Sequence, residues 1–246
     1  MRRKAIMLAT PSLGTVSIWW TQQVATLLWP LNLGRRVAFQ QDAVGDEIAE
    51  ARNALVTRAL KLDAEGPIEI DSIFWIDDDV LVQRTALCKL YDHHVPIAAG
   101  LYFTKGEPAS PLAFPGRLQG TIKFEPDKVT RVWGVGMGLT LVKLYVYKSL
   151  LPGIAKDKYG RPEFYKTNRT YEIEDGMIDC GGTEDLYFCQ LVTKLGIEPL
   201  LDTSKHTVGF HHDRDTNQGY PKEQFDQWQA NKPIQWQTET AIVSWE

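Results

Sequence analysis

The sequence predicts an α/β fold with a Rossmann-like, mostly parallel central sheet that is flanked by helices. Two observations predict this class. Between residues 4 and 76, short apolar runs alternate with segments of helical periodicity, which is the rhythm of parallel strands joined by helices. The run from Ile73 to Ile76 is continuously apolar and β-prone, as expected of a central strand that is covered on both faces.

The elements of the N-terminal part follow from their residue patterns. Residues 4–9 form an apolar run that stops at Thr10 and Pro11, which predicts a buried first strand opening into a loop. Residues 36–40 alternate apolar and polar side chains like a half-buried strand, and residues 46–62 repeat apolar side chains at helical spacing. The expected order is strand 4–9, helix 16–29, strand 36–40, helix 46–62 and strand 73–76.

The second half of the chain is less regular. Thr183 is a candidate N-cap of a helix, with Glu184 and Asp185 in its first turn and Gly196 at its end. No repeat or linker interrupts the chain, so we expect a single domain over residues 1–246. The further expected elements are strands at 97–103 and 129–133, a helix at 139–150, a loop or lid over 152–180 and a final strand at 197–201.

The composition limits the classes of protein to which this chain could belong. Hydrophobic residues make up 43% and charged residues 24% of the chain, so a sizeable core is expected. The net charge of -4 gives no overall attraction for phosphate backbones, so nucleic acid is a possible partner that charge does not indicate. The N-terminal apolar run is too short for a signal peptide, and no segment approaches the ~20 apolar residues of a membrane span. We therefore expect a cytoplasmic protein without a membrane span.

Three adjacent aspartates, Asp77, Asp78 and Asp79, directly follow the buried strand. Their mutual repulsion at the end of an apolar strand calls for an external positive charge or open solvent. In extended geometry Asp77 and Asp79 point to the same side, so this pair could bind one divalent ion. Carboxylate oxygens suit Mg²⁺ or Mn²⁺, which substrate phosphates and water then complete. A solvated acidic turn is the alternative.

The segment from Ile73 to Val82 resembles the DxD region of GT-A glycosyltransferases. Its spacing to Ala51-Arg52-Asn53, to residues 97–103 and to residues 182–189 is similar to that of small bacterial and viral members of this superfamily, of the family 2 type. The resemblance covers roughly residues 4–212.

This resemblance implies a GT-A-type sheet and the metal-dependent transfer of a sugar from a nucleotide diphosphate sugar, for which we expect UDP. It implies a nucleotide-donor half at about 1–105 and an acceptor half at about 106–246, which includes the lid. The acceptor hydroxyl could belong to a glycan, a protein, a small molecule or a modified nucleobase. Donor and Mn²⁺ or Mg²⁺ are thus the expected ligands.

The resemblance also implies roles for residues on the donor side. Thr10 and Pro11 would border the nucleotide, and Arg52 would approach it from the second helix, unless Arg52 forms a surface ion pair or covers the core. Asp77 and Asp78 would contact the donor's ribose and phosphates, with Asp77 and Asp79 on the metal. Gly136 would lie under the donor sugar, where glycine permits close approach, or else form a tight turn.

On the acceptor side, the resemblance places the catalytic base of inverting members at Glu184-Asp185. The reaction needs a carboxylate that accepts the acceptor's hydroxyl proton, and Asp185 is our candidate, with Glu184 next. The alternative is that both acids only favour the helix N-terminus. A histidine after a late strand often completes the metal site, and of His206, His211 and His212 we favour His211.

Two other functions stay open. A metal-dependent nucleotidyltransferase would also use aspartates, a divalent ion and a phosphate-bearing substrate. A nucleotide-sugar-binding module that has lost turnover would keep the donor site alone. An aspartyl phosphatase fits less well, because Leu81 stands where its motif requires Thr or Val.

Overall fold

A computed structural model of the protein describes residues 3–12, 14–30, 35–42, 47–117, 119–167, 172–174, 177–179, 182–237 and 242–245. The strands at 35–42, 172–174, 177–179 and 242–245 are described by their backbone alone.

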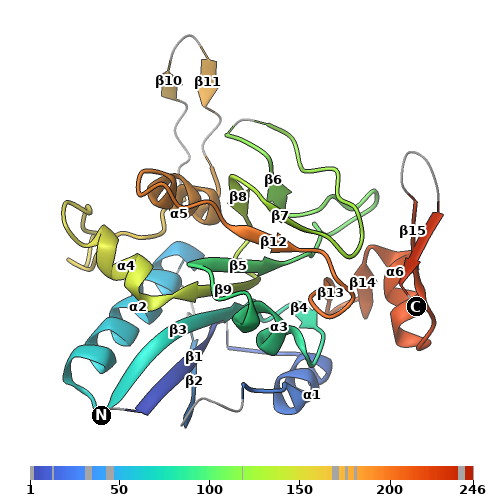
Figure 1. Ribbon diagram of the computed structural model, residues 1–246, viewed down its shortest axis with the longest axis horizontal. Coiled ribbons are helices and arrows are strands. Elements are labelled where there is room, and N and C mark those ends of the chain that lie inside the picture. Colours follow the sequence, from blue (N-terminus) through green and yellow to red (C-terminus); the bar gives the residue numbers. More distant parts are fainter. Residues whose placement is uncertain are drawn as a thin grey trace.

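The described elements build one seven-stranded central sheet in the order β2-β1-β3-β9-β5-β12-β7 (Figure 1). Five of these strands run in one direction, and only β9 and β7 oppose them. The sheet is therefore mixed and mostly parallel, as predicted, and strands from both halves of the chain contribute to it. The strands are β1 (Arg3–Ser12), β2 (Arg35–Asp42), β3 (Ile68–Ile76), β5 (Ile97–Gly100), β7 (Val129–Arg131), β9 (Leu139–Lys143) and β12 (Leu200–Asp202).

Helices cover both faces of the sheet, as expected. Trp75 of β3 points to the face where it contacts Arg52 of helix α2 and Tyr147 of helix α4. Lys143 pairs with Ser72 and so points to the other face, where its ammonium lies over the ring of Tyr91 in helix α3. The helices are α1 (Ile18–Thr26), α2 (Ile48–Glu65), α3 (Ala86–Asp92), α4 (Leu144–Leu150), α5 (Glu184–Thr193) and α6 (Lys222–Gln229).

Smaller sheets flank this body. Strand β13 lies between β4 and β14 in a three-stranded antiparallel sheet, which carries His211 and His212 to the end of β3. The remaining strands pair as β6 with β8, β10 with β11 and β15 with β16. These strands are β4 (Val80–Val82), β6 (Ala113–Phe114), β8 (Gly134–Val135), β10 (Glu172–Glu174), β11 (Met177–Asp179), β13 (Gly209–Asp213), β14 (Gln218–Tyr220), β15 (Ile234–Gln237) and β16 (Ile242–Trp245).

The expected helix at 139–150 is wrong in its first part. Residues 139–143 form strand β9, which is inserted antiparallel between β3 and β5, and the helix begins only at Leu144. Four of the five β9 residues, Leu139 to Val142, are buried, so the strand shows no strict alternation and its pattern does not separate it from a buried helix. The expected loop at 152–180 likewise contains the β10–β11 hairpin.

Helix α5 begins where the sequence predicts it. Thr183 occupies the N-cap position, although its side chain makes no capping hydrogen bond. Gly196 has φ of 71°, the left-handed conformation that favours glycine after a helix.

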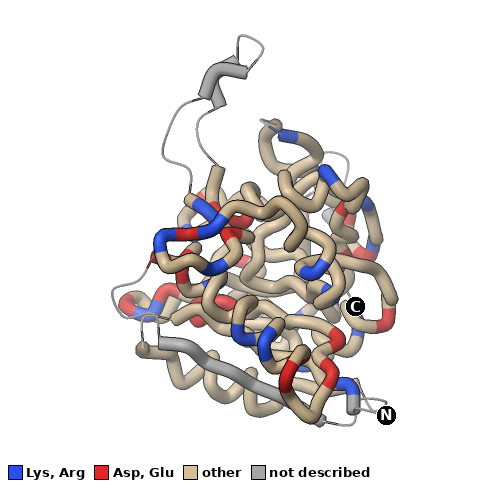
Figure 2. Tube along the Cα trace, turned by 90° about the vertical axis from the view of Figure 1, so that its left-hand side faces the viewer, with Lys and Arg blue, Asp and Glu red and all other residues tan. Residues whose placement is uncertain are grey.

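None of the helices in the described ranges is long and apolar enough to cross a membrane. Figure 2 shows lysine and arginine interspersed with aspartate and glutamate on the side of the molecule that it displays.

Candidate active site

The three aspartates lie in the turn between β3 and β4. The amide of Val80 donates to the Asp77 carbonyl at 3.1 Å, which closes the turn, and the indole of Trp20 donates to the same carbonyl at 2.9 Å. The Asp79 carbonyl accepts from the amide of His212 at 2.7 Å. Helix α1 and strand β13 therefore fix this turn from two sides.

Each aspartate carboxylate has a basic partner from a different part of the chain. Asp77 Oδ1 is 2.9 Å from Arg52 Nη2, and Asp78 Oδ1 is 2.7 Å from Arg214 Nη2. Asp79 Oδ2 contacts the ammonium of Lys105. The positive charge that three neighbouring carboxylates require is thus present within the protein. No sequence pattern marks Lys105 or Arg214, because only the fold brings them to the aspartates.

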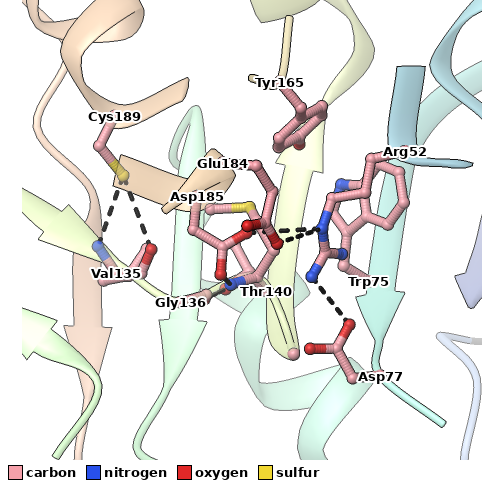
Figure 3. Close-up of polar contacts among 12 residues, drawn as sticks. Arg52, Trp75, Asp77, Val135, Gly136, Thr140, Tyr165, Glu184, Asp185 and Cys189 are labelled. Carbon is pink, nitrogen blue, oxygen red and sulfur yellow. Dashed lines mark hydrogen bonds and ion pairs between the residues drawn. The ribbon is translucent and has the colours of Figure 1, made fainter. Parts of the chain in front are cut away.

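Arg52 lies at the centre of a buried ion cluster (Figure 3). Besides Asp77, its Nε lies 3.5 Å from Glu184 Oε1 and 3.4 Å from Asp185 Oδ1. Its guanidinium also lies over the rings of Trp75 and Tyr165, at 5.3 and 5.9 Å from their centroids. Arg52 is fully buried, so the alternative of a surface ion pair is wrong.

The electrostatics of Arg52 fit this position. Burial alone would lower its pKa, but the charges of Asp77, Asp185 and Glu184 outweigh this effect, so its pKa is raised and its charge is secured. One cation thereby joins the aspartate turn after β3 to the first turn of α5.

Neighbouring contacts hold Arg52 in place. The Asn53 side chain accepts from the amides of Phe164 and Tyr165, each at 2.9 Å, and donates to the Tyr165 carbonyl at 2.8 Å. The Tyr165 hydroxyl in turn lies 2.7 Å from that of Tyr147, which accepts from Trp75 Nε1 at 2.9 Å. Tyr165 is thus fixed with its ring beside the Arg52 guanidinium.

Asp185 is the most perturbed carboxyl of the cluster. Burial raises its pKa to about 8, against the opposing charge of Arg52 and with repulsion from Glu184 and Asp77. Its Oδ2 accepts from the amide of Met137 at 2.9 Å, so this carboxylate fixes the β8–β9 turn. Burial likewise raises the pKa of Asp77, and the charge of Asp79 adds to the rise while Arg52 opposes it.

The glycines of the β8–β9 turn permit close packing beside the aspartates. A Cβ on Gly136 would lie 2.0 Å from the Tyr102 hydroxyl, and one on Gly138 would lie 2.8 Å from Asp77 Oδ2. The Gly138 amide donates to the Tyr102 hydroxyl at 2.9 Å. Gly136 is therefore required for packing against Tyr102, and Gly138, which the sequence did not single out, is the glycine at Asp77.

The three late histidines separate in space. His211 Nε2 lies 3.8 Å from Asp79 Oδ1, whereas His212, on the opposite side of β13, faces Asn217 and Phe225. His206 lies beside Thr85. Of these three histidines, His211, the one that we favour as a metal ligand, is therefore the one whose ring lies at an aspartate carboxylate.

Asp79 and His211 have the chemistry to share a cation. The Nδ1 atom of His211 faces the Phe103 carbonyl, which only accepts, so in the neutral ring Nδ1 carries the proton and Nε2 has the lone pair. Two ligands of one octahedral ion at ~2.1 Å are about 3.0 Å apart as neighbours and about 4.2 Å apart when opposite. The observed 3.8 Å lies between these two values, so a side-chain rotation must bring the two atoms to one of them before both bind one ion.

Among the residues that the structure describes, no three His, Cys, Asp or Glu side chains are grouped as a metal site. Asp77 faces Arg52, so the structure does not bring the three expected metal ligands, Asp77, Asp79 and His211, together. Asp79 and His211 form a two-residue set, and Mg²⁺-type sites are often completed by substrate phosphates and water.

Thr10 and Pro11 lie at the carboxyl end of β1, beside the end of β3, and both are buried. The Thr10 hydroxyl is a buried polar atom that has no hydrogen-bond partner in the described structure. The carboxyl ends of parallel strands are where open α/β sheets bind their ligands. The predicted site residues thus gather at the carboxyl-terminal end of the parallel strands.

Comparison with solved structures finds a likeness to A197 from STIV, known from a crystal structure, with a TM-score of 0.51 and 14% sequence identity. The likeness covers 87% of each chain and concerns the fold alone. No protein-family model matches the chain. No curated protein matches it.

Proposed function

We propose that the protein is a metal-dependent glycosyltransferase of the GT-A type, which transfers a sugar from a nucleotide diphosphate, with UDP expected, to a hydroxyl acceptor. The observation that carries this proposal is the ion cluster in which Arg52 contacts both Asp77 and the Glu184-Asp185 pair. It brings together the carboxylates that the reaction needs on its donor and acceptor sides.

On the donor side, Asp79 and His211 would hold Mn²⁺ or Mg²⁺. A nitrogen ligand beside a carboxylate favours Mn²⁺, since Mg²⁺ prefers oxygen. When bound, the ion would supply counter-charge to the diphosphate leaving group. Asp78 lies in the same turn, where the resemblance to DxD proteins implies a contact with the donor's ribose.

On the acceptor side, Asp185 would take the proton of the attacking hydroxyl. A base is most effective when its pKa lies near the working pH, and burial raises the pKa of Asp185 to about 8. Its hydrogen bond from Met137 orients one carboxylate oxygen, and its other oxygen, Oδ1, lies 3.4 Å from Arg52. Glu184 shares the same cation and adds the negative charge that keeps Asp185 basic.

A thermal-shift panel of nucleotide sugars, with and without Mn²⁺, tests the donor side. A ligand at about 100 times its dissociation constant should stabilise the protein by ~2.7 kcal/mol, and only in the presence of the ion. Asp79→Ala should abolish this stabilisation and leave the fold intact, because the ion loses a direct ligand. Asp226→Ala is the matched control, since Asp226 forms an exposed ion pair with Lys222 in helix α6. An equal metal-dependent shift in Asp79→Ala would contradict the assignment.

A further inference from the structure

The partners of the three aspartates differ in how freely they can move. The Arg52 side chain is 1% exposed and that of Arg214 is 30% exposed, whereas that of Lys105 is 51% exposed. Exposure of half the side chain leaves the Lys105 ammonium free to exchange its partner for another anion.

Arg214 is held by more than its aspartate. Its Nη1 donates to the Thr15 carbonyl at 2.5 Å, and its Nη2 donates to the Asp78 carbonyl at 3.1 Å. This side chain ties together the loops after β1 and β3. Arg52 is likewise enclosed by carboxylates and rings, so both arginines are fixed parts of the structure.

Lys105 projects from a braced loop that follows β5. The Thr104 amide donates to the Ser110 carbonyl at 2.8 Å, and the Ser110 amide donates to the Thr104 hydroxyl at 3.0 Å. These two bonds fix the base of the loop directly beside Lys105. The lysine side chain is a flexible stem with a hydrated point charge, so its ammonium can shift by rotamer changes alone.

The Lys105 ammonium and a divalent ion would use the same carboxylate. Asp79 contacts Lys105 through Oδ2, and its Oδ1 faces the lone pair of His211 Nε2 at 3.8 Å. An ammonium and a divalent cation on one carboxylate repel each other across a few ångströms. Binding of the ion therefore favours release of Lys105, and a diphosphate on that ion would provide the released ammonium with a new anionic partner.

We propose that Lys105 acts as a place-holder cation on Asp79, which the metal displaces and which then binds the donor's diphosphate. This inference rests on the proposed function. It predicts two effects of opposite sign when the charge of Lys105 is removed. Metal alone binds more tightly because its competitor is gone, and nucleoside diphosphate binds less tightly to the metal-loaded protein because a phosphate contact is gone.

Calorimetric titrations of MnCl₂ alone, and of UDP or GDP in saturating MnCl₂, test this exchange. Lys105→Met keeps the length of the side chain without its charge, and Lys105→Arg keeps the charge. Lys222→Met is the matched control, since Lys222 is 54% exposed and its ammonium pairs with Asp226 instead of an aspartate of the turn. Circular dichroism and the melting temperature confirm that each variant is folded.

In Lys105→Met we expect Mn²⁺ affinity to rise about fivefold to tenfold and diphosphate affinity to fall about tenfold, the effect of one charge-assisted hydrogen bond. Lys105→Arg and Lys222→Met should bind Mn²⁺ like the parent. Unchanged or weaker Mn²⁺ binding by Lys105→Met, or unchanged diphosphate binding, overturns the place-holder role. A parent protein that binds neither diphosphate in the presence of Mn²⁺ contradicts the proposed function instead.

Discussion

Arg52 of helix α2 and Asp185 of helix α5 meet with 3.4 Å between Nε and Oδ1, although they come from opposite halves of the chain. The same guanidinium contacts Asp77 at the end of β3. Arg52 therefore couples the turn that would bind the donor to the carboxylate that would act on the acceptor.

The first prediction concerns the pH dependence of stability. Burial raises the pKa of Asp185 from 3.8 to about 8, so the folded protein holds a proton that the unfolded chain releases. The contribution of Asp185 to the unfolding free energy is therefore fully present below about pH 4 and is lost as the pH rises towards about 8. Asp185→Asn does not titrate, so its unfolding free energy should increase relative to the parent across this interval. Urea unfolding at about pH 5 and about pH 8 measures the unfolding free energy of both proteins. If the difference in unfolding free energy between them were the same at both pH values, the raised pKa would be contradicted.

The second prediction concerns the cation itself. Arg52→Met leaves three carboxylates without their shared counter-charge, and breaking a buried pair in this way costs about 3–5 kcal/mol of unfolding free energy. Arg52→Lys should recover part of the loss, because it restores the charge without the forked geometry. Lys61→Met, at an exposed position of the same helix, should change stability by no more than about 0.5 kcal/mol. A loss below about 1 kcal/mol in Arg52→Met, measured by urea unfolding, would show that the cluster is not held by this cation.

The third prediction concerns the glycine beside Asp77. In Gly138→Ala the new methyl group would lie 2.8 Å from Asp77 Oδ2 and 3.0 Å from the Tyr102 ring, closer than packing allows. We expect a loss of about 1–3 kcal/mol in unfolding free energy and weaker metal-dependent nucleotide binding. Gly120→Ala is the control, since a Cβ there meets nothing within 4 Å. If Gly138→Ala and Gly120→Ala had the same unfolding free energy and the same nucleotide affinity, Asp77 and Tyr102 would move aside at no energetic cost, which contradicts the prediction.

Much of the fold could be predicted from the sequence because its signals are local. The apolar run before Asp77 identifies β3, and Glu184, Asp185 and Gly196 bound helix α5. Strand β9 could not be separated from a helix, because its antiparallel insertion between β3 and β5 is a tertiary event that buries Leu139 to Val142 on both faces and leaves no regular alternation. Strands of two or three residues, such as β4, are too short to show a period.

The same limit applies to the site, where local motifs could be predicted and contacts between distant segments could not. The motif around Asp77 to Asp79 indicated where carboxylates gather, and the alternation along β13 explains why His211 rather than His212 reaches them. The sequence could not predict that Arg52 is buried, because its charge pattern is that of a surface helix until three carboxylates from distant segments surround it. Lys105 was missed for the same reason, since only the loop after β5 brings it to Asp79.

The most direct test of the central claim identifies the products that the protein releases from a nucleotide sugar in the presence of Mn²⁺, with water standing in for the acceptor. A donor that binds in the thermal-shift panel is incubated with the parent, with Asp79→Ala and with Asp185→Asn, and the products are separated by chromatography. We expect the parent to release nucleoside diphosphate and free sugar, and Asp79→Ala to release neither. Asp185→Asn should bind the donor normally but turn over at least ~10²-fold more slowly, because its proton acceptor is gone. Release of nucleoside monophosphate or pyrophosphate, or no release from a donor that binds with metal, would contradict the assignment as a glycosyltransferase.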